Sequence, residues 1–361
     1  MLNQNKKTYK KLDKINFIFF SNSENSSGVA NKMKSFSKSF EKKNFKAESH
    51  VLNSRDGLLK SLKILIRLSF KIDGICFIRY NNSLNIFFFI SILILFFRRK
   101  KIILDVPTPI INNLKELKIS KTSFFKKLII IFNTLILGPL PFLFSNLVLQ
   151  YADENWYFNF LNRNNLLIGN GIDSEKYSNY FPKNHEQGQI KKFVIVANLA
   201  PWHGIDKIII ALSKVNYRFV LNIIGDGVEF INLIKIAEEL KMKSKIKFHG
   251  SLPLNKYVPI LYESDLGIGS MSWDLVGVKK SSTLKLREYA CCGIPVLYSG
   301  FDIDFENTDF NYKISNSQGS IDRFFKKFNT LKIKNQKKEI FKFARTKLDM
   351  DVKVETIFKS L

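Results

Sequence analysis

Residues 281–300 read SSTLKLREYACCGIPVLYSG, and this stretch decides how the second half of the chain folds. Ser281 and Ser282 precede a segment with helical periodicity, Gly293 follows it, and Pro295 introduces a short apolar strand. The pattern predicts a helix that is N-capped by one of the two serines and is followed by a buried strand. The start of such a helix leaves backbone amides free to bind an anion.

Two charged residues on this helix indicate a possible ligand. Lys285 and Glu288 are three positions apart, so they share one face of the helix. Free amides and the Lys285 ammonium suit the phosphates of a nucleotide diphosphate, and the Glu288 carboxylate suits ribose hydroxyls. The competing interpretation is a capped surface helix with a chance pair of charges. The spacing alone does not separate the two.

The length and the net charge of the chain limit the class of protein. The chain has 361 residues, which favours two domains, and a net charge of +26. Residues 1–173 hold 27 Lys and Arg against 11 Asp and Glu, so the excess of positive charge leans toward the first half. A basic surface beside apolar segments predicts contact with an anionic membrane or with polyanionic substrates. A bias of the whole chain toward Lys, Asn, Ile and Phe is the alternative explanation.

Cysteines and apolar segments bear on localisation. The three cysteines form no disulfide or zinc pattern, and the first residues are too polar for a secretory signal, so we expect a cytoplasmic setting. The apolar run 86–97 would span about 18 Å as a helix, against about 30 Å of hydrocarbon. The uncharged run 128–149 contains Gly138, Pro139 and Pro141, which interrupt a helix. We expect both runs to be buried or interfacial and the protein to be peripheral on the inner membrane face.

Strands and helices alternate along the chain, which predicts an α/β fold with two doubly wound parallel sheets. In the first half, strands are predicted at 15–20, 74–80 and 101–106, and residues 166–173 (LLIGNGID) are predicted as a last short strand with a turn. In the second half, strands are predicted at 192–199, 219–227, 245–250, 266–271 and 294–299. The predicted domains are 1–172 and 173–335, followed by a helical tail at 336–361 that could pack back on the first domain. Ligands of such sheets bind at the carboxyl ends of the strands.

That rule places three features of the first half in one cleft. Gly28 follows the first strand, Arg79 ends another, and Asp105–Thr108 ends a third. A glycine after the first strand allows the backbone to approach a ligand closely. Asp105 is the candidate catalytic carboxylate of this half.

Five segments, in the expected order, resemble the GT-B glycosyltransferases and in particular glycosyltransferase family 4. They are NGID (170–173), VANLAPWHGIDKIIIAL (196–212), IIGDGVEFINL (223–233), KIKFHGSLPLNKYVPILYESDLGIGS (245–270) and REYACCGIPVL (287–297). The resemblance implies the GT-B architecture, with a first Rossmann-like domain on the acceptor side and a second that binds the nucleotide sugar. It also implies a hexosyltransferase that retains anomeric configuration and needs neither metal nor cofactor. In the first half, GICFIRY and IILDVPTP (102–109) resemble enzymes that build bacterial surface polysaccharides such as capsule or lipopolysaccharide.

The resemblance also assigns roles to residues of the second half. It implies that Glu288 binds the ribose, and that Asn198 and His203 occupy the places of the Arg and Lys that bind the donor diphosphate in the family. Lys280 stands where the family has its first motif glutamate. We expect Lys285 and His203 to act in catalysis by stabilising the leaving diphosphate, Lys285 as the replacement cation and His203 as a hydrogen-bond donor or, when protonated, a cation. The complete set expected to bind the donor is Gly28, Asn198, His203, Ser281, Ser282, Thr283, Leu284, Lys285 and Glu288.

The expected reaction moves a sugar from a nucleotide diphosphate sugar to a glycan or lipid-linked acceptor, in cell-surface polysaccharide synthesis. The three departures from the family pattern leave two alternatives open: a GT-B nucleotide-sugar epimerase, or a donor-binding protein that has lost its chemistry. A nucleic-acid-binding protein is a more distant alternative. Only the positive charge suggests it, and no nucleic-acid-binding motif accompanies that charge.

Overall fold

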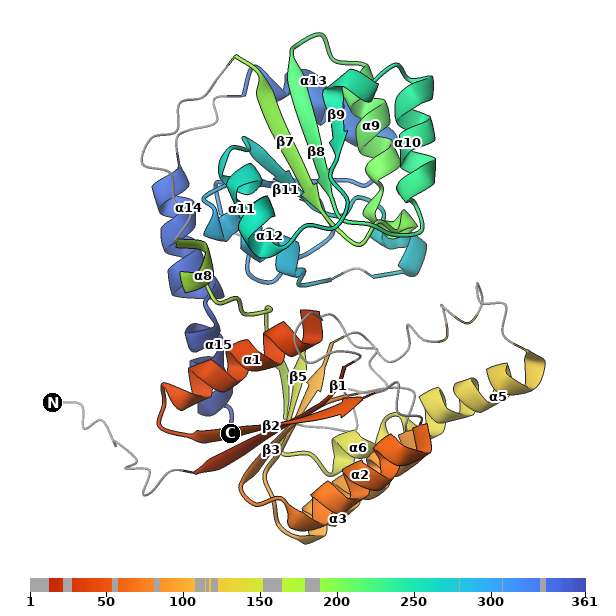
Figure 1. The fold of residues 1–361 in the computed structure, drawn as a ribbon, viewed down its shortest axis with the longest axis vertical. Coiled ribbons are helices and arrows are strands. Elements are labelled where there is room, and N and C mark those ends of the chain that lie inside the picture. The colour runs from red at the N-terminus through yellow and green to blue at the C-terminus, as the bar shows by residue number, and fades with distance from the viewer. Residues whose placement is uncertain are drawn as a thin grey trace, which may run out of the picture. The chain divides into compact units, whose positions relative to one another are not determined.

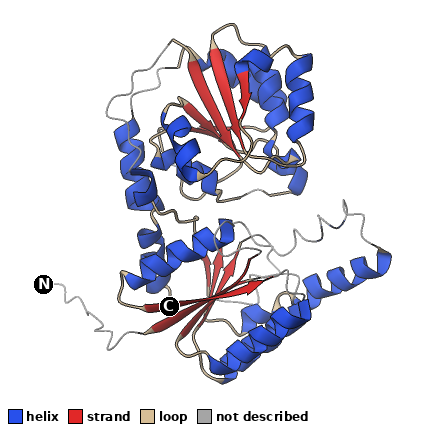
Figure 2. Cartoon of the chain, in the orientation of Figure 1, coloured by secondary structure: helices blue, strands red, loops and turns tan. Residues whose placement is uncertain are grey.

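The computed structural model describes residues 13–21, 28–53, 58–80, 85–107, 114, 117, 123–151, 164–178, 189–278, 280–306, 308–331 and 336–361. The chain divides into two compact units (Figure 1). Unit 1 consists of residues 1–168 together with 353–361, and unit 2 consists of residues 169–352. Each unit contains a six-stranded sheet with helices packed on it, as Figure 2 shows. The predicted α/β class with two wound sheets is therefore confirmed.

The sheet of unit 1 has the strand order β2-β1-β3-β4-β5-β6, and all its neighbouring strands are parallel. Its strands are β1 (Lys14–Ser21), β2 (Lys46–Asn53), β3 (Ile75–Arg79), β4 (Ile102–Val106), β5 (Leu147–Gln150) and β6 (Asn165–Leu167). Its helices are α1 (Gly28–Glu41), α2 (Leu58–Lys71), α3 (Asn85–Phe97), α5 (Phe124–Phe132), the π-helix η3 (Asn133–Leu137), α6 (Leu140–Leu143) and most of α15 (Met350–Lys359).

Successive residues of the central strands face opposite sides of this sheet, and each side has its own core. On one side, Phe17 and Phe77 pack with Phe40 of α1, which also contacts Phe358 of α15. On the other side, residues such as Ile78 join the apolar core that α2 and α3 cover. Both sides of the strands are buried, which explains why the predicted strands β1, β3 and β4 read as continuous apolar runs.

Two strands of unit 1 were not predicted. β2 has the sequence KAESHVLN and is largely half-exposed, because it lies at the edge of the sheet and lacks a continuous apolar run. β5 has only four residues, and it lies within the uncharged run 128–149 that also contains the end of α5, η3 and α6. An uninterrupted apolar composition hides the boundaries between these short elements.

The two apolar runs have different environments. In α3, which contains the whole run 86–97, Phe88, Ile92 and Leu95 are buried in the core of unit 1. In α5, by contrast, the described side chains are all half-buried or exposed. Among the described residues there is no helix with both the length and the apolar character needed to cross a membrane.

The sheet of unit 2 has the order β12-β11-β10-β7-β8-β9, again with parallel neighbours. Its strands are β7 (Lys191–Val196), β8 (Phe219–Ile224), β9 (Ile246–Phe248), β10 (Leu266–Ile268), β11 (Val296–Ser299) and β12 (Asn311–Ile314). Its longer helices are α9 (Ile205–Ser213), α10 (Phe230–Glu239), α11 (Leu254–Tyr262), α12 (Leu284–Cys291), α13 (Gln318–Phe328) and α14 (Lys337–Phe343). Its short helices are α8 (Glu175–Ser178), η4 (Pro201–His203), η5 (Lys243–Lys245), η6 (Trp273–Val276) and η7 (Ala344–Leu348).

This sheet is also covered on both faces. Phe193 and Leu221 belong to a core completed by α9, α10 and α13, whereas Val194 and Val296 belong to a core completed by α11, α12 and α14. The five strands predicted in this half are confirmed, but β12 and α13 were missed. The sheet order brings β7 to the centre, so loops from several strands meet at its carboxyl end.

Candidate active site

A pocket of about 480 Å³ opens in unit 2 at the carboxyl ends of β7, β8 and β9. The loop after each of these strands contributes to its wall, and α11, α12 and η4 supply the rest. The lining residues are Val196, Ala197, Asn198, His203, Ile224, Gly225, Ser251, Leu252, Tyr257, Thr283, Leu284, Lys285 and Glu288. Lys285 and Glu288 both line it, so the prediction that they share a helix face toward one site is confirmed.

The N-terminus of α12 forms one wall of the pocket. The N-cap residue is Thr283, with extended backbone angles, and no side chain caps the first turn. The Thr283 hydroxyl is buried and has no hydrogen-bond partner among the described residues. The prediction that Ser281 or Ser282 caps this helix is therefore wrong. An uncapped helix start beside an unpaired hydroxyl presents several donors to a bound anion.

Lys285 lies in a polar cluster within the wall. Its Nζ is 3.1 Å from His203 Nδ1 and donates to Ser270 Oγ at 3.1 Å, and the Ser270 and His203 atoms are 2.7 Å apart. Burial lowers the pKa of Lys285 to about 7, although the Glu288 carboxylate opposes this shift. Near neutral pH the amine therefore exchanges easily between charged and neutral forms. The charge of a bound anion would favour the charged form.

His203 remains neutral over the ordinary pH range. Burial, and next the Lys285 ammonium, lower the pKa of His203 to about 3. The expectation that His203 acts as an imidazolium in mildly acidic solution is therefore wrong, because a second cation and a dry environment both disfavour its charge. Its role here is to contact the Lys285 amine through Nδ1.

Glu288 is the fifth residue of α12, and two tyrosines hold its carboxylate. Tyr177 of α8 and Tyr257 of α11 each donate a hydrogen bond to Glu288 Oε1, both at 3.1 Å. Burial raises the pKa of Glu288 above its usual value, while these hydroxyls and Lys285 oppose the change. A carboxylate near the start of a helix that faces a cleft is expected to pack against little, and the two tyrosine contacts show that this expectation is wrong. Its other oxygen, Oε2, receives neither of the two tyrosine hydrogen bonds.

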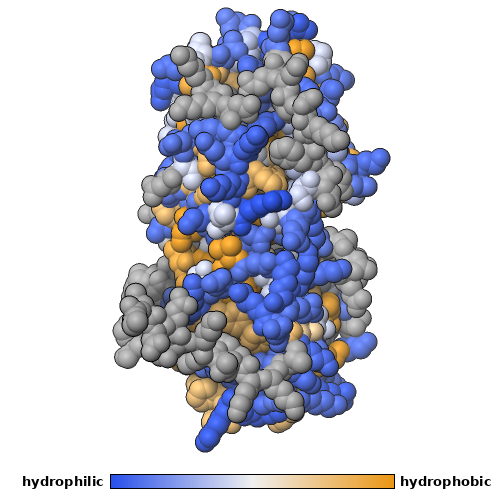
Figure 3. Space-filling model, turned by 90° about the vertical axis from the view of Figure 1, so that its left-hand side faces the viewer, coloured by the Kyte–Doolittle hydropathy of each residue, from blue (hydrophilic) through white to orange (hydrophobic). Residues whose placement is uncertain are grey.

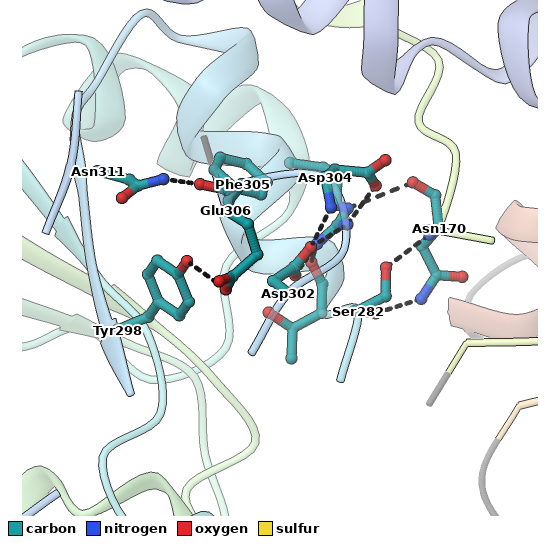
Figure 4. A network of polar contacts seen from close by, with 10 residues as sticks. Asn170, Ser282, Tyr298, Asp302, Asp304, Phe305, Glu306 and Asn311 are labelled. Atoms are coloured by element: carbon teal, nitrogen blue, oxygen red, sulfur yellow. Dashed lines mark hydrogen bonds and ion pairs between the residues drawn. The ribbon is translucent and has the colours of Figure 1, made fainter. Parts of the chain in front are cut away.

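A buried ion-pair network supports α12 from behind. Arg287 is fully buried; its Nη2 donates to Asp302 Oδ1 at 2.7 Å and to Asp304 Oδ2 at 2.5 Å, and its Nη1 donates to Asp302 Oδ2. Figure 4 shows the two carboxylates converging on this network beside Asn170 and Ser282. The guanidinium also donates to the Thr283 carbonyl at 3.1 Å. The network thus fixes the backbone at the start of α12.

The predicted donor-binding residues of unit 2 divide into those that line the pocket and those that do not. Asn198 is exposed within the pocket, and Thr283 and Leu284 line it. Ser282 instead is buried and accepts a hydrogen bond from the Asn170 amide at 2.6 Å (Figure 4). Ser281 donates its backbone N–H to the Phe301 carbonyl at 2.9 Å. Neither serine lines the pocket, so their contribution is to hold the loop.

Lys280, which stands where the family has its first motif glutamate, does not line the pocket. Its Nζ lies 5.2 Å from the centre of the Phe301 ring, and its backbone bridges to the same residue. Lys280 is absent from the pocket wall, whereas Lys285 is part of it. The cation available to a ligand in this pocket is thus delivered by α12.

The predicted residues of the first half belong to unit 1. Gly28 begins α1, and the loop before it lies outside the described residues, as does Thr108. Asp105 is fully buried at the end of β4, where it pairs with Arg79 at 2.5 Å and with Lys32 at 3.4 Å. Burial opposes its ionisation, but these two cations hold the pKa of the Asp105 carboxyl below its usual value. Two ion pairs thus hold the Asp105 carboxylate away from solvent, and its catalytic role stays a prediction.

Three important residues could not be recognised from the sequence. Ser270 contacts both Lys285 and His203, and the two tyrosines at positions 177 and 257 hold Glu288. Ser270 was visible only as the end of a predicted strand, and Tyr257 only as part of a predicted helix. No local signal connects them to the site, because their partners come from other elements.

Comparison with known proteins supports the same region. Residues 176–302 match the family model described as glycosyl transferases group 1. This match spans the pocket and α12 but not unit 1. A comparison with curated protein sequences gave no significant match.

Many solved structures share the fold of the whole chain. The structure of Anabaena HepE in complex with UDP and glucose superposes with a TM-score of 0.67 at 15% identity, covering 97% of this chain and 100% of HepE. The lipopolysaccharide outer core galactosyltransferase WaaB, in its apo form, superposes with a TM-score of 0.63 at 13% identity, covering 96% and 100%. A putative UDP-N-acetylglucosamine 2-epimerase from Listeria monocytogenes gives 0.55 at 11% identity, covering 97% and 96%. These similarities identify the fold as GT-B.

Proposed function

We propose that this chain, a GT-B glycosyltransferase of the hexosyltransferase type with a group 1 domain in unit 2, transfers a sugar from a nucleotide diphosphate sugar to a glycan or lipid-linked acceptor. The reaction retains anomeric configuration, needs no metal, and serves the synthesis of a cell-surface polysaccharide. The donor occupies the pocket at the carboxyl ends of β7, β8 and β9.

One observation carries the proposal: the uncapped start of α12, Lys285 and Glu288 all line the same pocket. The free amides and the Lys285 ammonium receive the diphosphate, and Glu288 receives the ribose hydroxyls one turn along. As the bond to the sugar breaks, negative charge develops on the diphosphate. Donors that are already in place stabilise that charge more in the transition state than in the ground state. His203 and Ser270 position the amine for this task.

Two structural neighbours support the choice of ligand. HepE was solved with UDP and glucose and also with UDP-glucose, and WaaB is a galactosyltransferase of the lipopolysaccharide outer core. Retention and metal independence are proposed from the resemblance to glycosyltransferase family 4. In this chain, Lys285 would provide the positive charge that a metal ion provides in other enzymes acting on diphosphates.

We extend the proposal to the cellular setting. The positive charge of residues 1–173 and the exposed apolar helix α5 suit peripheral attachment to the inner, anionic face of a membrane. A lipid-linked acceptor would be presented at that surface.

Donor titration tests the proposed function directly. UDP-glucose, used as the first probe, should bind the wild type and should bind Lys285→Ala at least about tenfold more weakly, since a charge-assisted contact is lost. Glu288→Gln should also weaken binding, because the amide can replace the acceptor for the tyrosines but not its charge. Lys235→Ala, at an exposed lysine of α10, is the matched control. Equal affinity in the wild type and Lys285→Ala, across a panel of nucleotide sugars, would refute the assignment.

An epimerase remains the second candidate. The observation that favours it is the absence of the family's Arg, Lys and first Glu, with Asn198, His203 and Lys280 in their places, together with the fold shared with the Listeria protein. Incubation with a donor labelled in the sugar separates the possibilities. Label transferred to an acceptor supports the glycosyltransferase, whereas label in an isomeric nucleotide sugar supports the epimerase.

A further inference from the structure

Unit 1 exposes a large apolar surface on one group of helices. Phe125, Ile129 and Phe132 follow one another at helical spacing on α5, with 77%, 60% and 56% of their surfaces exposed. We call this the α5 surface; it consists of Phe124, Phe125, Leu128, Ile129, Ile131 and Phe132 of α5, Ile136 of η3, and the neighbouring Leu143, Phe96 and Phe97. Soluble monomers rarely expose so many contiguous large apolar side chains, so the α5 surface requires a partner.

The α5 surface is continuous because the elements that carry it contact one another. α5 runs directly into η3, η3 packs on α3 and α6, and the Phe96 ring of α3 lies 5.2 Å from that of Phe144. Figure 1 shows α5 extending from the group formed by α2, α3 and α6. The face shown in Figure 3, on the side of α14 and α15, has many hydrophilic residues with several hydrophobic patches between them. Exposed apolar side chains also occur elsewhere, as at Val228 and Ile231 of unit 2, but the α5 surface gathers ten of them on connected helices.

The charges around this surface are mostly positive. The sequences of α2, α3, α5, η3 and α6 contain no Asp or Glu. Lys127 lies within α5, and residues 98–101, which follow α3, read RRKK. Lys71 ends α2 near the same loop, where Arg98 donates to the Ser69 carbonyl at 2.7 Å. Asp73 pairs with Lys100 at this loop, so the rim contains an acidic side chain but is basic overall. An apolar surface with a predominantly basic rim complements lipid tails below anionic headgroups.

From these observations we infer that α5 and η3 lie flat in the headgroup region of an anionic bilayer and insert the α5 surface among the acyl chains. Together the two elements comprise 14 residues, about 20 Å of helix, which is too short to span about 30 Å of hydrocarbon but sufficient to lie along the interface. This inference rests on the membrane attachment included in the proposed function, and it names the residues that make the contact.

A second copy of the chain is the alternative occupant, and the charge distribution disfavours it. In a two-fold dimer built on the α5 surface, the basic rim of one chain would face the basic rim of the other. Residues 1–173 alone carry 27 Lys and Arg against 11 Asp and Glu, so such a contact would bring like charges together. An anionic bilayer meets the same rim with opposite charge.

Fluorescence at a single position tests the insertion. In Phe125→Trp, the added tryptophan should shift its emission to shorter wavelength when vesicles containing phosphatidylglycerol are added, and brominated lipids should quench it. Spectra of the wild type correct for the native tryptophans. Ile231→Trp is the matched control, because Ile231 is 62% exposed on α10 of unit 2. Equal responses of the two variants, or no shift in Phe125→Trp, would overturn the inference.

Flotation with the same vesicles tests the energetics. The double variant Phe125→Ser and Ile129→Ser should bind at least about tenfold more weakly than the wild type, since two large apolar side chains no longer enter the acyl region. The control, Val228→Ser with Ile231→Ser, should bind as the wild type does. Both double variants should titrate UDP-glucose as the wild type does. If UDP-glucose bound to none of these proteins, the wild type included, while vesicle binding was preserved, the proposed donor site would be refuted and the membrane contact of the α5 surface would not.

Two further results would reject the bilayer as partner. Undiminished flotation of the α5 double variant would show that other residues make the contact. A concentration-dependent dimer in sedimentation equilibrium, abolished by the same double variant, would assign the α5 surface to a contact between two copies of the chain.

Discussion

Donor binding should be coupled to the uptake of one proton by Lys285. In the free protein, burial lowers the pKa of Lys285 to about 7, so about half of the molecules carry an uncharged amine at pH 7. A bound diphosphate adds negative charge beside Nζ and raises this pKa. The affinity for the donor should therefore be highest below pH 7 and should decrease as the pH rises above 7.

The size of the effect follows from the same pKa. About nine-tenths of the amines are charged at pH 6 and about one-tenth at pH 8, so a ligand that binds only the charged form should lose about tenfold in affinity between these values. His203, whose pKa is about 3, stays neutral throughout and adds nothing to this slope. Close to one proton should be taken up per donor at pH 8 and almost none at pH 6.

Isothermal titration in buffers of different ionisation enthalpy measures that uptake. A nucleotide sugar such as UDP-glucose is the suitable probe, because its diphosphate is esterified at both ends and keeps a constant charge over this range. Lys285→Met should abolish the pH dependence. Lys337→Met should preserve it, because Lys337, whose pKa burial lowers to about 8, contacts the Tyr262 carbonyl outside the pocket. A constant affinity with no proton uptake at pH 8 would show that the Lys285 amine does not meet the diphosphate.

Three further predictions concern stability, each measured by urea denaturation. Burial lowers the pKa of His203 from 6.5 to about 3, so the folded state binds fewer protons than the unfolded state. The free energy of unfolding should therefore fall by about 2 kcal/mol between pH 6.5 and 5. His203→Gln should lessen that fall, and an identical pH profile in both proteins would contradict the prediction. Arg287→Met should cost about 3–5 kcal/mol by leaving buried carboxylates unpaired, whereas Lys243→Ala, at an exposed pair, should change little; similar effects of the two would argue against the buried network. Gly225→Ala should destabilise the protein far more than Gly250→Ala. A Cβ at position 225 would lie 1.8 Å from the Ala197 carbonyl oxygen, whereas a Cβ at position 250 meets open space, so Gly250→Ala should cost only about 1–2 kcal/mol for its positive φ. Equal costs of the two substitutions would refute this account.

The sequence was sufficient for most of the fold, because buried parallel strands leave continuous apolar runs between helical segments. It failed where an element lacks that signal, as in the edge strand β2 with its charged and half-exposed residues. It failed again between 128 and 149, where an unbroken apolar composition conceals a helix, a π-helix and a strand. Composition alone could not show that α3 buries one of its faces in the core while the described side chains of α5 are half-buried or exposed. That difference depends on which helices cover the sheet.

Within the site, local geometry was predictable and tertiary contacts were not. Lys285 and Glu288 were recognised because three residues along a helix fix their common face. The contacts of Ser270 and Tyr177 join segments that are distant in the chain, so no spacing rule reveals them. The predicted imidazolium of His203 was wrong, and the predicted catalytic role of Asp105 gained no support, for a related reason. Burial and neighbouring cations determine both charges, and these are properties of the folded chain.

The helix α15 has a consequence for how the protein is made. Val354 and Ile357 are fully buried, and Phe358 packs against Phe40 and Phe45, so residues from 353 onward complete the core of unit 1. On the ribosome, these residues emerge only after all of unit 2 has been synthesised. The core on the Phe40 side of the unit 1 sheet therefore stays incomplete until synthesis ends, whereas unit 2 can fold before then. The order of synthesis and the order of completion are reversed.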